Sequence, residues 1–413
     1  MKNIFLSILC LIPLGMLAQT TVVNPNDTRV ITTGVPFLLI TPDARAGGMG
    51  ELGVATSPDT YSQQWNPAKY AFAKEQIGVG ISYTPYLSDL VNDIFLGNLT
   101  FYNRISERSA WSASIKYFSL GEIEIITQQQ ADIGNFTPLI ERPNELAIDA
   151  SYALRLSDQF AMSVTGRFLR SDLKLQSQPD VEANAASTFA VDIAGYYQSE
   201  ETAYDSFNGR WRAGFNISNL GPKLKYDELG QENFLPTQLK LGGGFDFIFD
   251  EYNKLAVSVE VNKLLVPTPP KLGFVDLDDD GNQDTDDLST PDVNENEPTI
   301  IVGGQSDDVS FVSGIFQSFG DAPDGFSEEL KEFTYALGAE YWYQDSFALR
   351  AGYFNESEIK GARKFITLGA GFKYSAVRID VSYLFSASKV RNPLENTLRF
   401  SLTFNLGDTY DEL

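Results

Sequence analysis

The sequence predicts an all-β protein, a transmembrane β-barrel of about fourteen antiparallel strands with an N-terminal plug segment. Three observations lead to this prediction. The chain begins with an export signal yet has no later apolar run near 18 residues, fourteen segments alternate apolar and polar residues, and short links alternate with long ones. Because lipid offers backbone groups no hydrogen bonds, an exported chain without an apolar helix can cross a membrane only as a closed barrel.

Residues 1–18 have the features of a secretory signal peptide. Lys2 precedes an apolar run, and the small residue Ala18 stands before the expected cleavage point. The run is shorter than a bilayer span, which disfavours a membrane anchor. Cys10 lies inside this run rather than at its end, which disfavours a lipoprotein signal.

The composition excludes several classes of function. The chain has no histidine and a single cysteine, and this cysteine would be removed with the signal peptide. Ser-His-Asp and Cys-His catalysis and histidine-containing metal sites are therefore excluded, and we expect no enzyme. The 55 acidic residues against 31 basic ones disfavour nucleic acid as a partner.

The alternation identifies the wall of the barrel. In residues 145–156, one face carries only Leu, Ile, Ala and Tyr, and the other carries Ala, Asp, Ser and Arg. A soluble sandwich could explain one such strand, but charged or small residues recur on the second face, as a wet or plugged lumen allows. We predict strands at about 76–83, 94–102, 110–118, 145–156, 159–170, 186–198, 209–218, 237–249, 252–263, 332–343, 346–354, 365–374, 376–385 and 397–406.

The lengths of the links favour a barrel in a bacterial outer membrane over a soluble all-β protein. Links after the even-numbered strands are short, apart from a longer but modest one after the sixth, whereas most links after the odd-numbered strands are long, and the longest is 264–331. Short periplasmic turns and long extracellular loops are typical of outer-membrane barrels. The barrel is therefore expected over 76–406, with both termini in the periplasm and 407–413 as a periplasmic tail.

Residues 19–75 provide material to fill this barrel. Fourteen strands enclose more space than their own side chains fill. Gly47, Gly48 and Gly50 permit close backbone packing, and Trp65 is followed by the turn signal Asn66-Pro67. We predict a compact plug on the periplasmic side, with Trp65-Asn66-Pro67 as its hinge to the wall. The alternative, a disordered leader, is opposed by the segment's apolar residues.

The acidic stretch 276–287, "DLDDDGNQDTDD", has the spacing of a calcium loop. The glycine at the sixth position allows the sharp turn, and an aspartate at the twelfth predicts weak, extracellular-type affinity. The alternative is a solvated acidic run. The ligands of this structural Ca²⁺ would be Asp276, Asp278, Asp280, Asn282, Asp284 and Asp287.

The insertion 272–330 contains no lysine or arginine. Its stretch "VSFVSGIFQSF" places apolar residues at helical spacing, and exposed apolar surface of this kind marks contact sites. Two interpretations stay open: the stretch folds down over the barrel mouth, or it docks a partner. The candidate partner-binding residues are Phe311, Val312, Ile315, Phe316 and Phe319.

The N-terminal stretch also resembles known families. "ARAGGMGELGVATSPDTYSQQWNPAKYA" is similar to the signature of FadL-like barrels, in which a Gly/Ala-rich segment ending in Asn-Pro-Ala forms a hatch. With "TGVPFLLITPDARAGGMGELGVA", the strand series and the acidic loop, the whole chain resembles the PorV (LptO) family of the type IX secretion system.

The resemblance to PorV implies a function. It implies a component that binds the C-terminal signal domains of exported cargo at the large translocon barrel. The cargo is then passed to a surface sortase, which attaches it to lipopolysaccharide. The alternative function, implied by FadL, is an outer-membrane transporter of hydrophobic small molecules.

Overall fold

The computed structural model describes residues 29–87, 91, 93–126, 137–173, 185–226, 232–274, 299–388 and 396–410. Its main sheet has fifteen strands, of which the two-residue β9 (Thr202–Ala203) only extends the edge of β10. Fourteen strands therefore form the wall, as the sequence predicts. They are β1 (Glu75–Pro85), β2 (Ile94–Arg104), β3 (Ser109–Leu120), β6 (Asn144–Arg155), β7 (Phe160–Asp172), β8 (Ala186–Gln198), β10 (Asn208–Leu220), β13 (Gln238–Ile248), β14 (Asn253–Leu264), β17 (Phe333–Tyr343), β18 (Phe347–Asn355), β19 (Lys364–Tyr374), β20 (Val377–Ser386) and β21 (Leu398–Thr409).

The sheet closes on itself, and all neighbouring strands are antiparallel. β10 pairs with β13, and the first strand, β1, pairs with the last, β21. Side chains alternate across the wall: on β7, Val164 is 57% exposed on the outside while Thr165 is buried inside. Closed pairing and an apolar outer face are the architecture of outer-membrane barrels. Among the described residues, we find no helix of the length and hydropathy needed to cross a membrane.

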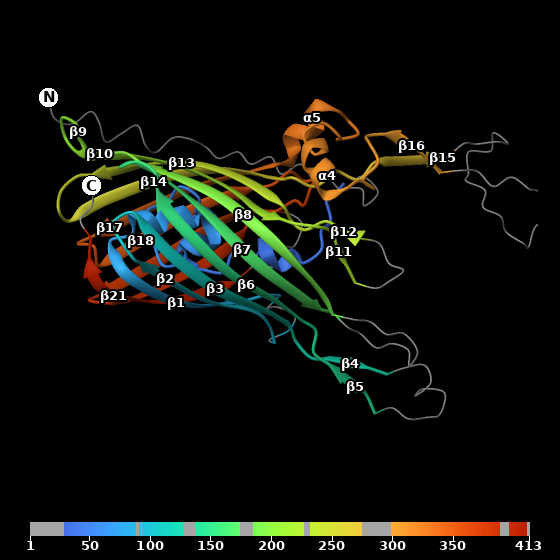
Figure 1. The fold of residues 1–413 in the computed structure, drawn as a ribbon, viewed down its shortest axis with the longest axis horizontal. Helices are drawn as coiled ribbons and strands as arrows, with labels where there is room; N and C mark the ends of the chain where they lie inside the picture. The colour runs from blue at the N-terminus through green and yellow to red at the C-terminus, as the bar shows by residue number, and fades with distance from the viewer. Residues whose placement is uncertain are drawn as a thin grey trace, which may run out of the picture.

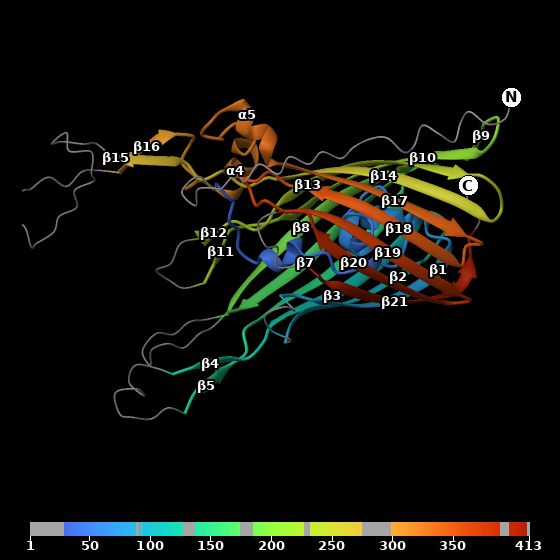
Figure 2. The same cartoon turned by 180° about the vertical axis from the view of Figure 1, so that it is seen from behind.

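The two ends of the barrel differ (Figures 1 and 2). One end carries the short links, such as 105–108 and 375–376, and we call it the short-turn end. The other end, the long-loop end, carries three two-stranded ribbons and two short helices. The ribbons pair β4 (Ile123–Ile125) with β5 (Leu139–Glu141), β11 (Leu224–Lys225) with β12 (Glu232–Asn233), and β15 (Lys271–Phe274) with β16 (Thr299–Gly303); the helices are α4 (Phe311–Gln317) and α5 (Phe326–Glu329), followed by the 3₁₀ turn η4 (Leu330–Glu332).

Most of the N-terminal segment, residues 29–74, lies inside the barrel (Figure 2). It contains η2 (Pro36–Leu39), α1 (Ala44–Gly47), α2 (Ser62–Trp65) and η3 (Pro67–Phe72). We expected this segment on the periplasmic side, but it begins at the opposite end. The Arg29 backbone N–H donates to the carbonyl of Ile359, in a link of the long-loop end, at 2.9 Å. The chain then crosses the lumen and reaches β1 at the short-turn end.

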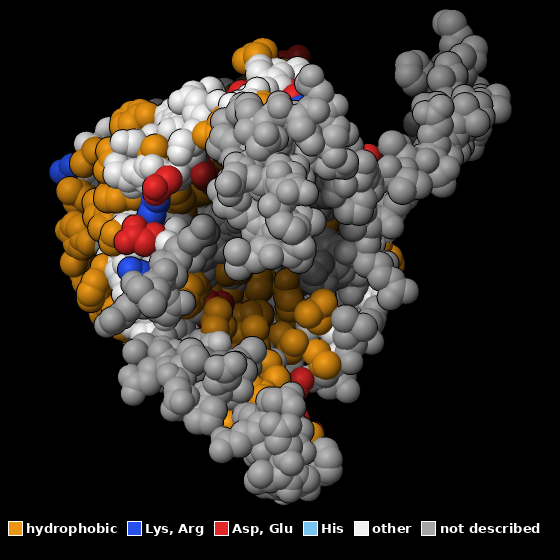
Figure 3. Space-filling model, turned by 90° about the vertical axis from the view of Figure 1, so that its right-hand side faces the viewer, with side chains coloured by type: hydrophobic (Ala, Val, Ile, Leu, Met, Phe, Trp, Pro, Cys, Tyr) orange, Lys and Arg blue, Asp and Glu red, His pale blue; other side chains and the backbone are white. Residues whose placement is uncertain are grey.

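The lumen is layered along this path. Near the long-loop end, buried apolar side chains from segment and wall form one cluster, which includes Phe37, Leu38, Leu96, Phe118 and Phe365. Figure 3, which looks onto this end, shows hydrophobic side chains in the recess of the mouth. Towards the short-turn end, Tyr70 of the segment stacks on Tyr102 of β2, with ring centroids 4.6 Å apart.

The ends of the chain differ in part from the predicted boundaries. β21 continues to Thr409, which pairs with Glu75, so the separate tail expected over 407–413 is shorter. The predicted signal peptide, residues 1–18, lies outside the described residues.

Candidate docking surface at the long-loop end

The predicted hinge residues form a fixed turn inside the barrel. Helix α2 ends at Trp65 because Asn66, which precedes Pro67, is extended at φ −165°. The Asn66 side-chain amide donates to the carbonyls of Val54 and of Gly195 on β8, both at 2.9 Å. Its side-chain oxygen accepts from Ala68 N–H and caps η3, which starts at Pro67. The turn is thereby tied to the wall.

Trp65 links the two helices of the segment. Its indole Nε1–H donates to Asp43 Oδ1 at 2.8 Å, and Asp43 Oδ2 accepts from Ala46 N–H at the start of α1. A carboxylate at this N-cap position satisfies a backbone donor that the helix leaves free. This hydrogen bond joins the end of α2 to the start of α1.

The predicted glycines lie where the segment touches the wall. A Cβ on Gly47 would be 2.8 Å from the Ser382 hydroxyl, and one on Gly48 would be 3.0 Å from the Cα of Gly369. Gly50 has a φ of +75°, which favours glycine, and its backbone lies against Gly352 of β18. The close packing that the sequence predicts for these three glycines is present.

Buried ion pairs also hold the segment to the wall. Arg45 pairs with Glu340 of β17 at 2.6 Å, and Arg399 of β21 pairs with Glu51 at 2.5 Å. Glu260 of β14 accepts from the backbone N–H groups of Gly53 and Val54 at 2.8 and 2.9 Å. Glu340, Arg399 and Glu260, three inward-facing charged residues of the strands, are therefore partners of the N-terminal segment.

At the long-loop end, residues 305–332 form a unit that we call the cap. Helix α4 starts at Ser310, whose hydroxyl accepts from Ser313 N–H, and Gly314 packs against Phe234. The cap thus packs against a neighbouring loop. Of the predicted partner-binding residues, Phe316 is 75% exposed and Val312 and Phe319 are also exposed, whereas Phe311 and Ile315 are half-buried.

Two further apolar residues of the cap are exposed and were not predicted. They are Phe326, at 77%, and Leu330, both on or next to α5. The sequence signal was present, because Phe326 and Leu330 are four residues apart, at helical spacing. We define the apolar surface of the cap as Val312, Phe316, Phe319, Phe326 and Leu330.

Beneath this surface is a buried ion cluster, which sequence reasoning missed. Three acidic residues of the cap pair with three cations from elsewhere in the chain. Glu332 contacts Lys263 and, at 2.9 Å, Lys360; Glu329 contacts Lys263 at 3.4 Å; Glu328 contacts Lys360 and Arg29, both at 2.8 Å. A fourth buried acid, Asp321, accepts from the Thr268 backbone N–H at 3.0 Å. Removing charges from water is costly unless they are paired, so these contacts hold the cap to the barrel.

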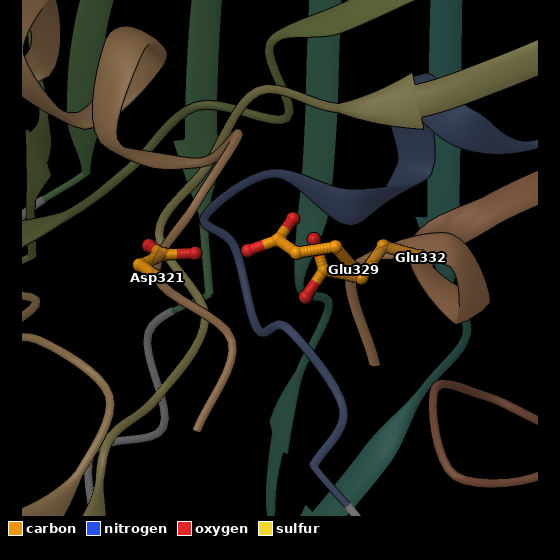
Figure 4. A group of neighbouring side chains, drawn as sticks. All are labelled: Asp321, Glu329 and Glu332. Carbon is orange, nitrogen blue, oxygen red and sulfur yellow. The ribbon is translucent and has the colours of Figure 1, made fainter. Parts of the chain in front are cut away.

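Three of these carboxylates could be considered as a metal site. Ligand oxygens of Asp321, Glu329 and Glu332 lie within 4.8 Å of one another, and Figure 4 shows their carboxyl groups turned together. However, Lys263 already contacts both glutamates, and Lys360 contacts Glu332. The arrangement fits an ion-pair cluster better than a metal centre. Burial, together with the charges of Glu332 and Glu329, raises the pKa of Asp321 to about 6, although the Thr268 N–H opposes this.

The predicted calcium ligands, residues 276–287, lie outside the described residues. The described chain brings β15 and β16, the two strands that flank this stretch, together as one ribbon at the long-loop end. Calcium binding therefore stays a prediction.

Comparisons with known proteins place the chain in a family. No curated protein matches its sequence. Among solved structures, it is similar to the Pseudomonas putida toluene transporter TodX (12% identity, TM-score 0.46, covering 91% of this chain and 98% of that one). It is also similar to the CymD monoaromatic hydrocarbon channel (13%, TM-score 0.46, 89% and 98%) and a Pseudomonas aeruginosa FadL homologue (12%, TM-score 0.40, 92% and 99%).

Residues 23–271 match the family described as type IX secretion system protein PorV. This outer-membrane β-barrel therefore belongs to the PorV family of the type IX secretion system.

Proposed function

We propose that this protein is a non-enzymatic carrier of exported cargo. It binds the C-terminal signal domain of a cargo protein as the cargo leaves the large translocon barrel. It then passes the cargo to the surface sortase, which attaches it to lipopolysaccharide. The family membership supports a role in type IX secretion, and the steps named here go beyond it.

The observation that carries the proposal is the apolar surface of the cap. Its five side chains are 49–77% exposed at the end that bears the long loops, which is the extracellular end in outer-membrane barrels. Large exposed apolar side chains are unfavourable in water and mark contact sites in soluble loops. The described acidic residues Asp307 and Asp308 border α4 in a segment without lysine or arginine, which favours a partner of basic character.

The interior of the barrel supports a carrier over a channel. The lumen contains the N-terminal segment, held by buried ion pairs and apolar packing. Two cavities within the described barrel have volumes of about 80 and 260 Å³ and are lined by many charged side chains. Ligand pockets usually have about 300–1,000 Å³ and mainly apolar walls. The alternative, transport of hydrophobic molecules, therefore has less support from this structure.

A pull-down from detergent-solubilised outer membranes tests the proposal. The tagged wild-type protein should retain the translocon barrel and exported cargo, identified by mass spectrometry. Phe316→Asp and Val312→Asp should lose the cargo while keeping a heat-resistant barrel. The matched control is Ile140→Asp on β5, an aliphatic residue 52% exposed at the same end but outside the cap. Equal cargo recovery with all three variants would exclude the cap as the docking site.

A further inference from the structure

The first described residues of the chain lie across the long-loop end and touch three separate loops. The Arg29 guanidinium donates to Glu328 at 2.8 Å and to Asp324 at 3.2 Å, and both acids belong to the cap. The Arg29 backbone N–H donates to Ile359, in the link between β18 and β19. Gly34 N–H donates to the carbonyl of Phe234, in a third loop, at 2.8 Å.

These contacts reach both helices of the cap. Glu328 is on α5, so Arg29 holds that helix directly. Phe234, which accepts from Gly34, packs against α4 so closely that a Cβ on Gly314 would be 2.7 Å from its ring. Lys223 lies over the same ring, 4.4 Å from its centroid, and 3.8 Å from Asp308 of the cap. Helix α4 is therefore held through Phe234, and α5 through Glu328.

The same stretch continues into the barrel. Phe37 lies parallel to Phe118 of β3, with centroids 6.2 Å apart, inside the apolar layer of the lumen. Further along, Ala44 N–H donates to Ser401 of β21 at 2.8 Å. The stretch is thus anchored in the lumen below and in the loops above.

We infer that residues 29–37 form a strap that enters the barrel from its cell-surface mouth and positions the cap. Arg29 is a positioning residue: it does not belong to the apolar surface but orients the helices that carry it. Glu328 is fully buried and has cationic partners in Arg29 and Lys360. Loss of Arg29 would leave the Glu328 carboxylate with one cationic partner instead of two. Keeping its negative charge buried would then be less favourable. The contacts between the strap and the cap do not depend on the proposed function. Any effect of the strap on cargo binding does rest on that function.

The direction of the strap is tested by cysteine labelling. The chain's single cysteine, Cys10, lies in the predicted signal peptide, so a maleimide can react only with an introduced cysteine after that peptide is removed. Val30, 42% exposed, is changed to cysteine, and intact cells are treated with a membrane-impermeant maleimide. Val30→Cys should react as fully as Phe316→Cys. Glu107→Cys, in a short turn, should react only after the outer membrane is permeabilised. Protection of Val30→Cys in intact cells and its labelling after permeabilisation would overturn the inference.

The positioning role needs a reporter that does not depend on cargo. Ser318, at the end of α4, is fully buried, and Ser318→Cys changes it little in size. Adding Arg29→Met to this reporter should raise its labelling rate at least tenfold, because the cap loosens. Arg29→Lys should raise it less, since lysine keeps the charge but not the two-pronged geometry. Arg142→Met, which breaks an exposed pair with Glu122 in another loop, is the matched control and should change nothing.

The outcomes separate this inference from the proposed function. An unchanged labelling rate with Arg29→Met and with Glu328→Gln, in a barrel that still resists heat, would overturn the strap. A raised rate with normal cargo recovery, together with normal recovery from Phe316→Asp, would support the strap and contradict the proposed docking site. If Arg29→Met does not assemble, Glu328→Gln alone gives the measurement.

Discussion

Arg45 of the N-terminal segment and Glu340 of β17 form a two-pronged ion pair inside the barrel. Arg45 Nη2 is 2.6 Å from Glu340 Oε2, and Nε is 3.0 Å from Oε1. Both side chains are nearly fully buried, and Glu340 also accepts from Arg350 at 2.7 Å. This pair connects the contents of the barrel to its wall.

We expect Arg45→Met to destabilise the protein strongly. The change leaves Glu340 with one cation fewer and costs about 3–5 kcal/mol, the usual effect of breaking a buried pair. Unfolding by urea in lipid micelles measures it. The double variant Arg45→Met/Glu340→Gln should be less destabilised than the sum of the two single variants. Additive single effects would show that the two residues do not interact.

Gly352 of β18 should not tolerate a side chain. A Cβ at this position would be 2.0 Å from Gly50 N and 2.1 Å from Met49 C, both backbone atoms that cannot rotate away. Gly352→Ala is therefore expected to prevent the N-terminal segment from seating, and the heat-resistant form seen on gels should be lost. Gly166→Ala on β7 is the control, because a Cβ there has nothing within 4 Å. Normal assembly of Gly352→Ala would show that the segment does not pack here.

The cap should lose stability as pH rises from about 4 to 7. The pKa of Asp321 is about 6 in the folded cap, above its ordinary value of 3.8, mainly because of burial. The folded state therefore binds more protons than the unfolded state between these values, so the stabilisation present at acid pH disappears as pH rises through 6. Thermal unfolding at pH 5 and pH 7 measures the change.

Asp321→Asn is the variant that isolates this group. Its amide stays neutral, so the difference between the two pH values should shrink, and at pH 7 the variant should be more stable than the wild type. Asp307→Asn, an exposed acid of the cap, should keep the wild-type slope. A slope that survives in Asp321→Asn would assign the pH dependence to other groups.

The stretch 276–287 should bind Ca²⁺ weakly. Titration calorimetry on the full-length protein is expected to give a dissociation constant on the order of 10⁻⁴–10⁻³ M, typical of extracellular sites. Asp276→Asn with Asp280→Asn should abolish the heat, whereas Asp307→Asn, in the same insertion but outside the motif, should not. If the wild type gives no Ca²⁺-dependent heat, the calcium prediction is wrong and the stretch is a solvated acidic run.

The strands could be predicted from the sequence because their signal is local. All fourteen predicted segments coincide with wall strands, since lipid and lumen impose opposite requirements on successive residues. The glycines and the Asn66-Pro67 turn were predictable for the same reason, because backbone freedom and proline act on neighbouring residues.

The end at which the N-terminal segment begins, and the ion cluster, could not be predicted. Both depend on pairs far apart in sequence, such as Arg29 with Glu328 and Lys263 with Glu332. The segment 272–330 contains no lysine or arginine, yet Glu328 and Glu329 are buried, because their cations come from outside the segment. Local composition does not contain that information.

The central claim is that the apolar surface of the cap binds exported cargo, and its most direct test is a titration. A purified C-terminal signal domain is added to the detergent-solubilised wild type and to Phe316→Asp, with Ile140→Asp as control. We predict saturable binding that Phe316→Asp weakens at least tenfold and Ile140→Asp leaves unchanged. Equal affinity of all three proteins, or no binding by the wild type, would contradict the claim.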